Sequence, residues 1–163
     1  MGNEDDASVA ALEELYRSRY RRFLRVAIAV TGSREAAADT VQEGFARALR
    51  HRHEFRGEGS LEAWVWRTVL NVARTDTRRS RRETIGDLPE RAAENGHPPV
   101  HPELRAAVAA LPERQRQALF LRHYADLSYD EIADVLGVAR GTVAATLHAG
   151  HEAVRQATQG VAL

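Results

Sequence analysis

The chain of 163 residues contains no cysteine and no lysine. Without cysteine it cannot form disulfides, thiolate zinc sites, iron–sulfur clusters or a cysteine nucleophile, and we expect a cytoplasmic location. Long hydrophobic runs are also missing, because no run, residues 26–30 included, approaches the roughly 20 residues that span a bilayer. The acidic residues 1–6 lack the layout of a signal peptide, so we expect no membrane insertion.

Acidic and basic residues balance over the whole chain, 23 of each, but they are unevenly distributed. Residues 1–14 hold five acidic residues and no basic one, whereas residues 15–82 hold 16 arginines against seven acidic residues. Residues 83–103 are acidic again. A block this basic suggests a polyanionic partner. Arginine favours forked contacts to phosphates and bases, although a GC-rich genome would equally explain the absence of lysine.

Helical periodicity fills the first part of the chain, and no segment shows the alternation of a β-strand. We predict helices over residues 8–31, 34–52 and 60–82. Gly32 fits a C-terminal cap of the first helix, and Ser33 and Ser60 fit N-terminal caps of the next two. These helices form the first predicted domain, residues 8–82.

A different composition separates this domain from the next. Residues 83–102 contain four of the five prolines, two glycines and an excess of acidic residues, without helical period. We interpret them as a semi-extended acidic linker, either functional or a simple tether. The predicted fold is therefore all-α, with two small helical domains, residues 8–82 and 103–160, joined by a proline-containing linker.

The second domain ends in a helix-turn-helix pattern. Ser128 and Glu131 form a capping-box spacing before a short helix, Gly137 allows a sharp turn, and a last helix begins near Arg140. In this motif the second helix enters the major groove of DNA with its N-terminal end. A helical hairpin that binds no DNA has the same spacing and is the alternative.

The order and spacing of these segments resemble the extracytoplasmic-function (ECF) sigma factors of bacterial RNA polymerase, over about residues 12–158. The residues that carry the resemblance lie in both halves: 31–33, 38–48, 55–57, 61–67, 111–116, 127–133, 136–138 and 141–143. The resemblance implies binding to the beta and beta-prime subunits of core RNA polymerase, promoter DNA as a second partner, an anti-sigma factor as a possible third, and no cofactor or metal. It implies no catalysis by this chain.

The resemblance also implies roles for individual residues. One helix face is expected to dock on the polymerase, and it carries Asp39, Gln42, Glu43 and Arg47. The alternative is that these residues form an ordinary solvated face. Thr40 and Gly44 depart from the leucine and threonine common in the family. The residues expected to contact the −10 element and to stabilise its melted form are Arg56, Ser60, Trp64, Arg67, Asn71, Arg74 and Arg78. For the arginines from Arg78 onward, a solvated helix end is the alternative.

Trp64 and Trp66 lie about 200° apart on a helix, so they cannot share a face. We expect Trp64 to line the core or a pocket wall and Trp66 to be the more exposed. For the −35 element the expected contacts come from the last helix: Arg140, Gly141, Thr142, Thr146 and His148. No fixed positive charge lies between Arg140 and Arg155, where the family usually has several, so weak −35 binding is predicted.

Two other functions remain open from the sequence. One is a helix-turn-helix regulator or adaptor that works without core polymerase. The other is a degenerate sigma-like interaction protein that no longer reads DNA. His148, His151 and Glu152 have a spacing that could hold a metal, but no further ligand is evident and a solvated cluster is expected.

Overall fold

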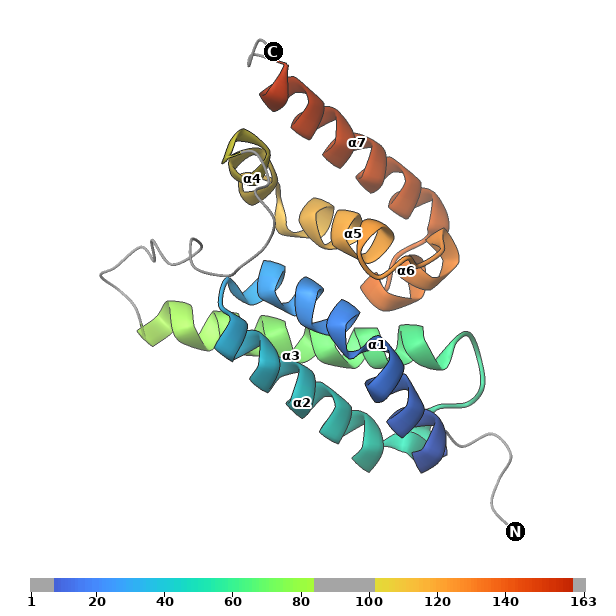
Figure 1. Cartoon of the computed structure of the whole chain (residues 1–163). Helices are drawn as coiled ribbons and strands as arrows, with labels where there is room; N and C mark the ends of the chain where they lie inside the picture. Colours follow the sequence, from blue (N-terminus) through green and yellow to red (C-terminus); the bar gives the residue numbers. More distant parts are fainter. Residues whose placement is uncertain (1–7, 84–101, 160–163) are drawn as a thin grey trace. The chain divides into compact units, whose positions relative to one another are not determined.

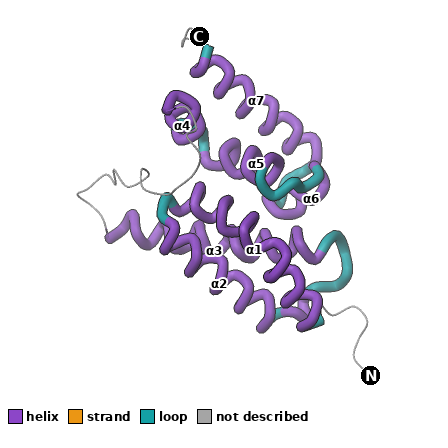
Figure 2. The backbone as a smooth tube through the Cα atoms, in the orientation of Figure 1, coloured by secondary structure: helices purple, strands orange, loops and turns teal. Residues whose placement is uncertain are grey.

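The structure, a computed structural model, describes residues 8–83 and 102–159, and for residues 77–83 it describes the backbone alone. The predicted linker, residues 83–102, lies almost wholly outside the described residues, and so do residues 160–163. Every regular element in the described ranges is a helix, so the all-α fold is confirmed (Figures 1 and 2). These helices form two compact units, separated by the undescribed residues 84–101.

The first unit contains three long helices and one short one. They are α1 (Val9–Thr31), α2 (Arg34–Arg50), the 3₁₀ helix η1 (Arg52–Glu54) and α3 (Leu61–Glu83). Helices α1 and α2 run antiparallel, and α3 packs against both (Figure 1). The predicted second helix is two residues too long, because the chain tightens into η1 after Arg50.

The predicted caps set the ends of these helices. Gly32 has φ +77°, a left-handed conformation that glycine adopts at little cost, and its N–H bonds the carbonyl of Ile28. The Ser33 hydroxyl accepts from the N–H of Ala36, and the Ser60 hydroxyl accepts from that of Ala63. Short polar side chains therefore position α2 and α3.

An aromatic cluster forms the core of the first unit. The Phe23 ring stacks on the Trp66 ring with centroids 3.9 Å apart, and it meets the edge of Phe45 at 4.9 Å. Tyr16 meets Phe45 at 5.0 Å. These four side chains come from all three long helices, so the cluster fixes their mutual positions.

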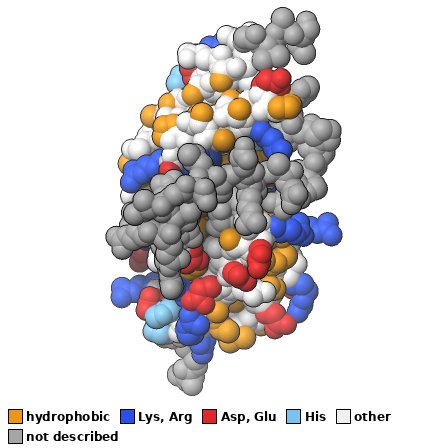
Figure 3. All heavy atoms as spheres, turned by 90° about the vertical axis from the view of Figure 1, so that its left-hand side faces the viewer, with side chains coloured by type: hydrophobic (Ala, Val, Ile, Leu, Met, Phe, Trp, Pro, Cys, Tyr) orange, Lys and Arg blue, Asp and Glu red, His pale blue; other side chains and the backbone are white. Residues whose placement is uncertain are grey.

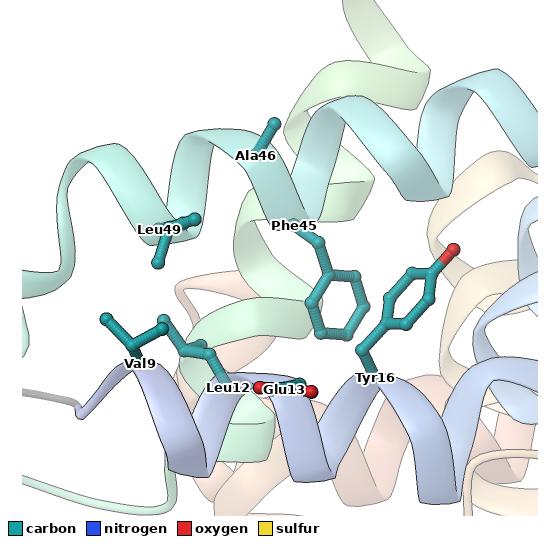
Figure 4. Close-up of a pocket in the computed structure, with 7 residues that line it drawn as sticks. All are labelled: Val9, Leu12, Glu13, Tyr16, Phe45, Ala46 and Leu49. Atoms are coloured by element: carbon teal, nitrogen blue, oxygen red, sulfur yellow. The ribbon is translucent and has the colours of Figure 1, made fainter.

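An apolar groove of about 340 Å³ opens where the start of α1 diverges from the end of α2. Figure 4 shows the residues that line it: Val9, Leu12, Glu13, Tyr16, Phe45, Ala46 and Leu49. Leu12 is buried at its base, whereas Val9 and Leu49 are 52% and 40% exposed. Leu49 therefore lies at the rim of the groove.

The second unit contains α4 (Pro102–Ala109), α5 (Glu113–His123), α6 (Tyr129–Leu136) and α7 (Arg140–Thr158). The predicted capping box is present, because the Ser128 hydroxyl accepts from the N–H of Glu131 and the Glu131 carboxylate accepts from the N–H of Ser128. Gly137 has φ +65° and turns the chain into α7. Ile132 of α6 and Leu147 of α7 are fully buried, as expected for two crossing helices of a helix-turn-helix.

Candidate functional site

The outer face of α2 carries the four residues expected to dock on a partner. Asp39, Gln42 and Arg47 are exposed and Glu43 is half-buried, so all four reach solvent on the side of α2 opposite the core. Asp39 has no ion-pair partner within the described residues. We call these four residues the α2 ridge. Their shared face follows from the i, i+3 and i+4 spacing.

Glu43 is held in place at the centre of the α2 ridge. Its carboxylate accepts a hydrogen bond of 2.7 Å from Arg47 Nε and one of 3.1 Å from Arg50 Nη2. The bond from Arg47 is the main cause that lowers the pKa of Glu43, and Arg50 adds to it. The ridge therefore presents a charged carboxylate in a fixed orientation.

The two departures from the family pattern lie on the opposite, buried side of α2. A Cβ atom added to Gly44 would lie 2.5 Å from Val69 Cγ2 and 2.9 Å from Val69 Cα. Gly44 therefore allows a close approach of α2 to α3, which the sequence did not reveal. Thr40 is 1% exposed, and its hydroxyl has no hydrogen-bond partner among the residues that the structure describes. Neither residue alters the α2 ridge.

A second candidate surface runs along the outside of α3. Steps of four and three residues place Ser60, Trp64, Arg67, Asn71 and Arg74 on one line, which we call the α3 stripe. All five side chains are exposed or half-buried, whereas the opposite face of α3 is buried. The stripe contains no acidic residue. Arg78 continues the same spacing, but its side chain lies outside the described residues.

The loop before α3 leads into this stripe. Arg56 is exposed there, next to two glycines with positive φ, Gly57 at 70° and Gly59 at 80°. The Ser60 hydroxyl is used as the N-terminal cap of α3. Asn71 is exposed, and its backbone carbonyl accepts from the Thr75 hydroxyl.

The expected exposure of Trp66 is wrong. Trp66 is fully buried in the aromatic cluster, and its Nε1 donates to Glu62 Oε1 at 3.4 Å. Trp64 is half-buried on the α3 stripe, with its ring 5.7 Å from that of Phe55. The residues on the same helix face indicate which tryptophan is buried. Trp66 shares its face with the apolar residues Val69, Leu70 and Ala73. Trp64 shares its face with the polar residues Ser60, Arg67 and Asn71.

The start of α7 carries the residues expected to contact upstream DNA. Gly141, Thr142 and His148 are exposed, and Thr146 is half-buried. Arg140 is exposed, but its Nε lies 3.2 Å from Asp130 Oδ1 and its guanidinium 5.7 Å from the centre of the Tyr129 ring. Contact with a phosphate would have to compete with Asp130.

Fixed positive charge is scarce on α7. Its other arginine, Arg155, is bound by Glu152 at 2.6 Å, and this bond is the main cause that raises the pKa of Arg155. The face of the second unit that Figure 3 shows, in the upper part of the view, is dominated by uncharged side chains. In the lower part of the view, acidic and basic side chains of the first unit lie close together.

A contact between two histidines links α5 to α7. His123 Nε2 and His151 Nε2 are 2.8 Å apart, although the residues are 28 positions apart in the chain. No pattern in the sequence predicts this pair. Among the described residues no group of three or more histidines and carboxylates could hold a metal ion.

Comparisons with known proteins agree with this division into two units. A family model described as Sigma-70 region 2 matches residues 15–83, and one described as Sigma-70, region 4 matches residues 101–153. The first therefore covers the α1–α3 unit from Leu15 onward, with both the α2 ridge and the α3 stripe. The second covers most of the helix-turn-helix unit.

Two relatives cover most of the chain. ECF RNA polymerase sigma factor SigE of Mycolicibacterium smegmatis is 32% identical over 162 residues, which cover 93% of this chain and 63% of the relative. The chain thus spans less than two thirds of that relative's length. RNA polymerase sigma factor YlaC of Bacillus subtilis is 33% identical, with 85% of this chain and 86% of the relative covered.

Two solved structures share the fold. The sigma factor RpoE of Bartonella quintana, crystallised with the anti-sigma factor NepR, matches 93% of this chain and 98% of its own with a TM-score of 0.77 and 21% identity. CnrH, in complex with the cytosolic domain of CnrY, matches 96% of this chain and 92% of its own with a TM-score of 0.72 and 18% identity. With both sigma regions matched in order and relatives above 30% identity over most of its length, this chain belongs to the ECF sigma factors of RNA polymerase.

Proposed function

We propose that the chain directs core RNA polymerase to promoters by three surfaces, each with its own target. The α2 ridge binds the polymerase, the α3 stripe with the preceding loop binds the melted −10 strand, and the start of α7 contacts −35 DNA. The chain itself catalyses no reaction and acts in the cytoplasm, where the polymerase is. Among residues 8–83 and 102–159, no helix combines the length and hydropathy that a membrane span requires.

The observation that carries the proposal is the composition of the α3 stripe. Single-stranded DNA is held by aromatic rings that stack on bases and by positive charge along the backbone. The stripe offers one aromatic ring at Trp64, guanidinium groups at Arg67 and Arg74, and an amide at Asn71 for a base edge. No carboxylate interrupts these groups, so a phosphate chain laid along α3 meets no repulsion from the stripe.

The α2 ridge supports the docking role by its rigidity. Glu43 is already oriented by Arg47 and Arg50, so little side-chain entropy is lost when a partner binds it. Asp39 is exposed without an ion-pair partner among the described residues, and it is available to a basic group of the polymerase. Charge reversal on this ridge is therefore expected to prevent assembly with the polymerase.

Promoter contact by α7 alone is expected to be weak, because both of its arginines are bound by carboxylates. This observation favours a second candidate function, a sigma-like interaction protein that no longer reads upstream DNA. An anti-sigma partner is a further proposal, since RpoE of Bartonella quintana, which shares the fold, was solved in complex with the anti-sigma factor NepR.

The test is transcription in vitro with core RNA polymerase and the full-length chain on promoter DNA from its own genome. Asp39→Arg with Glu43→Arg should abolish binding to core polymerase, whereas Glu14→Arg, an exposed charge reversal on α1, should leave it intact. If the ridge variant still binds and initiates, the docking role of the α2 ridge is wrong.

The α3 stripe is tested on the same promoters. Arg67→Ala should lower affinity for the melted strand and reduce its salt dependence by about 0.7 in log–log slope, the value for one phosphate contact on single strands. Arg25→Ala, an exposed arginine of α1, is the matched control. Equal losses from both variants would show that the stripe has no special role. Footprints of the polymerase complex that lack any upstream protection would favour the second candidate function.

A further inference from the structure

The charged and imidazole groups of α7 share one side of the helix. At 100° per residue, Arg140, His148, His151 and Arg155 fall within a sector of about 80°. Both arginines of this line are paired with carboxylates on the surface, Arg140 with Asp130 and Arg155 with Glu152. The two histidines are therefore the groups that can add positive charge to this side of α7.

His151 is held in place by His123 at the end of α5. The Nε2 atoms are 2.8 Å apart, so one ring donates its N–H to the other. Burial, then His151 and then Arg122, lower the pKa of His123, which favours His123 as the neutral, accepting ring of the pair. The protonated ring has an N–H on each nitrogen, one for His123 and a second for another acceptor.

Charged groups occur on every helix that packs on α7, and those near this pair lie on α5 and α7. On α5 these are Arg122 and His123, and on α7 itself His148, Glu152 and Arg155. α6 contributes Asp130, which is bound to Arg140. α4 carries Glu103 and Arg105, neither of which is among the groups that shift the pKa of His123.

We propose that protonated His148 and His151 bind phosphates of duplex DNA, with His123 as the positioning residue. This inference rests on the proposed contact of α7 with DNA and adds the residues that supply its missing charge. Because a phosphate stabilises the protonated imidazole, binding takes up protons and affinity rises as the pH falls. The weak upstream contact expected at neutral pH is then a contact that depends on protons.

The test is fluorescence anisotropy of a fluorescein-labelled duplex of mixed sequence with the full-length chain at constant ionic strength. Phosphate contacts do not depend on sequence, so no promoter needs to be known. For each histidine that takes up on average half a proton on binding over this range, affinity should be about tenfold higher at pH 6 than at pH 8.

Variants separate α7 from the other histidines of the chain. His148→Gln with His151→Gln should remove most of the pH dependence, whereas His53→Gln, an exposed histidine of the first unit, should retain it. His148→Arg should raise affinity at pH 8 and reduce the pH dependence. His148→Gln alone serves if the double variant does not fold, because His148 is exposed and the ring that pairs with His123 of α5 is that of His151.

A wild type without pH dependence, or a double variant that keeps it, overturns the role of the histidines. A different result would refute the proposed contact between α7 and DNA itself. In that case the double variant Arg140→Ala with Thr142→Ala leaves both the duplex affinity and the upstream footprint of the polymerase complex unchanged. A loss of affinity in that variant without any effect of the histidine variants overturns the histidine inference and leaves the proposed function standing.

Discussion

Gly44 provides a test of how closely the helices of the first unit must pack. In the structure it lies against Val69 of α3, and an added Cβ would come within 2.5 Å of Val69 Cγ2 and 2.9 Å of Val69 Cα. Rotation of the valine side chain can relieve the first contact but not the second, because Cα belongs to the backbone. Gly44→Ala therefore requires α2 and α3 to move apart.

Two opposing effects set the magnitude. Alanine in the interior of a helix is about 1 kcal/mol more favourable than glycine. Forcing an extra methyl into a packed core costs roughly 1–3 kcal/mol, and a contact with backbone belongs in the upper part of that range. We expect a net loss of about 1–2 kcal/mol in the free energy of unfolding, with Tm lower by about 4–8 °C for each kcal/mol.

The assay is denaturant unfolding followed by tryptophan fluorescence. Both tryptophans, Trp64 and Trp66, lie on α3, so this signal reports on the first unit alone. Gly141→Ala is the matched control, because a Cβ at Gly141 meets nothing within 4 Å. Followed by circular dichroism, it should leave the second unit as stable or more stable. If Gly44→Ala proves as stable as wild type, the close approach of α2 and α3 does not constrain residue 44.

Three further predictions concern stability. Thr40→Val removes a buried hydroxyl without a partner and should raise the fluorescence-detected free energy of unfolding by about 1 kcal/mol, whereas Thr40→Ser, which keeps the hydroxyl and loses a methyl, should lower it. Ser128→Ala removes the capping box of α6 and should cost about 1 kcal/mol of second-unit stability by circular dichroism; no change would exclude a role for the cap. Burial, together with the charges of His151 and Arg122, lowers the pKa of His123, so the unfolded chain binds that proton more readily than the folded one. The second unit should therefore be most stable above about pH 6.5 and lose stability as the pH falls below it, and in melting curves His123→Gln should flatten this dependence; a steeper dependence in the variant would contradict the assignment.

Features of the fold that depend on neighbouring residues could be predicted from the sequence. Gly32, Ser33 and Ser128 act within one helical turn of their own position, and all three have the predicted capping roles. The α3 stripe has the same local origin, since its spacing alone places its residues on one face. The orientation of Trp66 is local information as well, because Val69, Leu70 and Ala73 share its face of the helix and mark that face as buried.

Contacts between helices could not be predicted in this way. The approach of Gly44 to Val69 and the pairing of His123 with His151 join residues that are distant in the chain. Periodicity assigns each residue to a face but does not say which residue of another helix it meets. From the sequence, Gly44 is only a departure from the family pattern, whereas the structure shows that its lack of a side chain allows the close approach to Val69.

The apolar groove at the start of α1 has a consequence for the order in which the first unit opens. Leu12 is the one buried side chain in the first two turns of α1, whereas Phe23, Val26 and Ala27 are all buried further along. Local fraying of those first turns exposes little apolar surface, so their amide hydrogens should exchange with solvent rapidly. Amides near Phe23 should exchange only when the whole unit unfolds, which gives α1 a gradient of protection along its length.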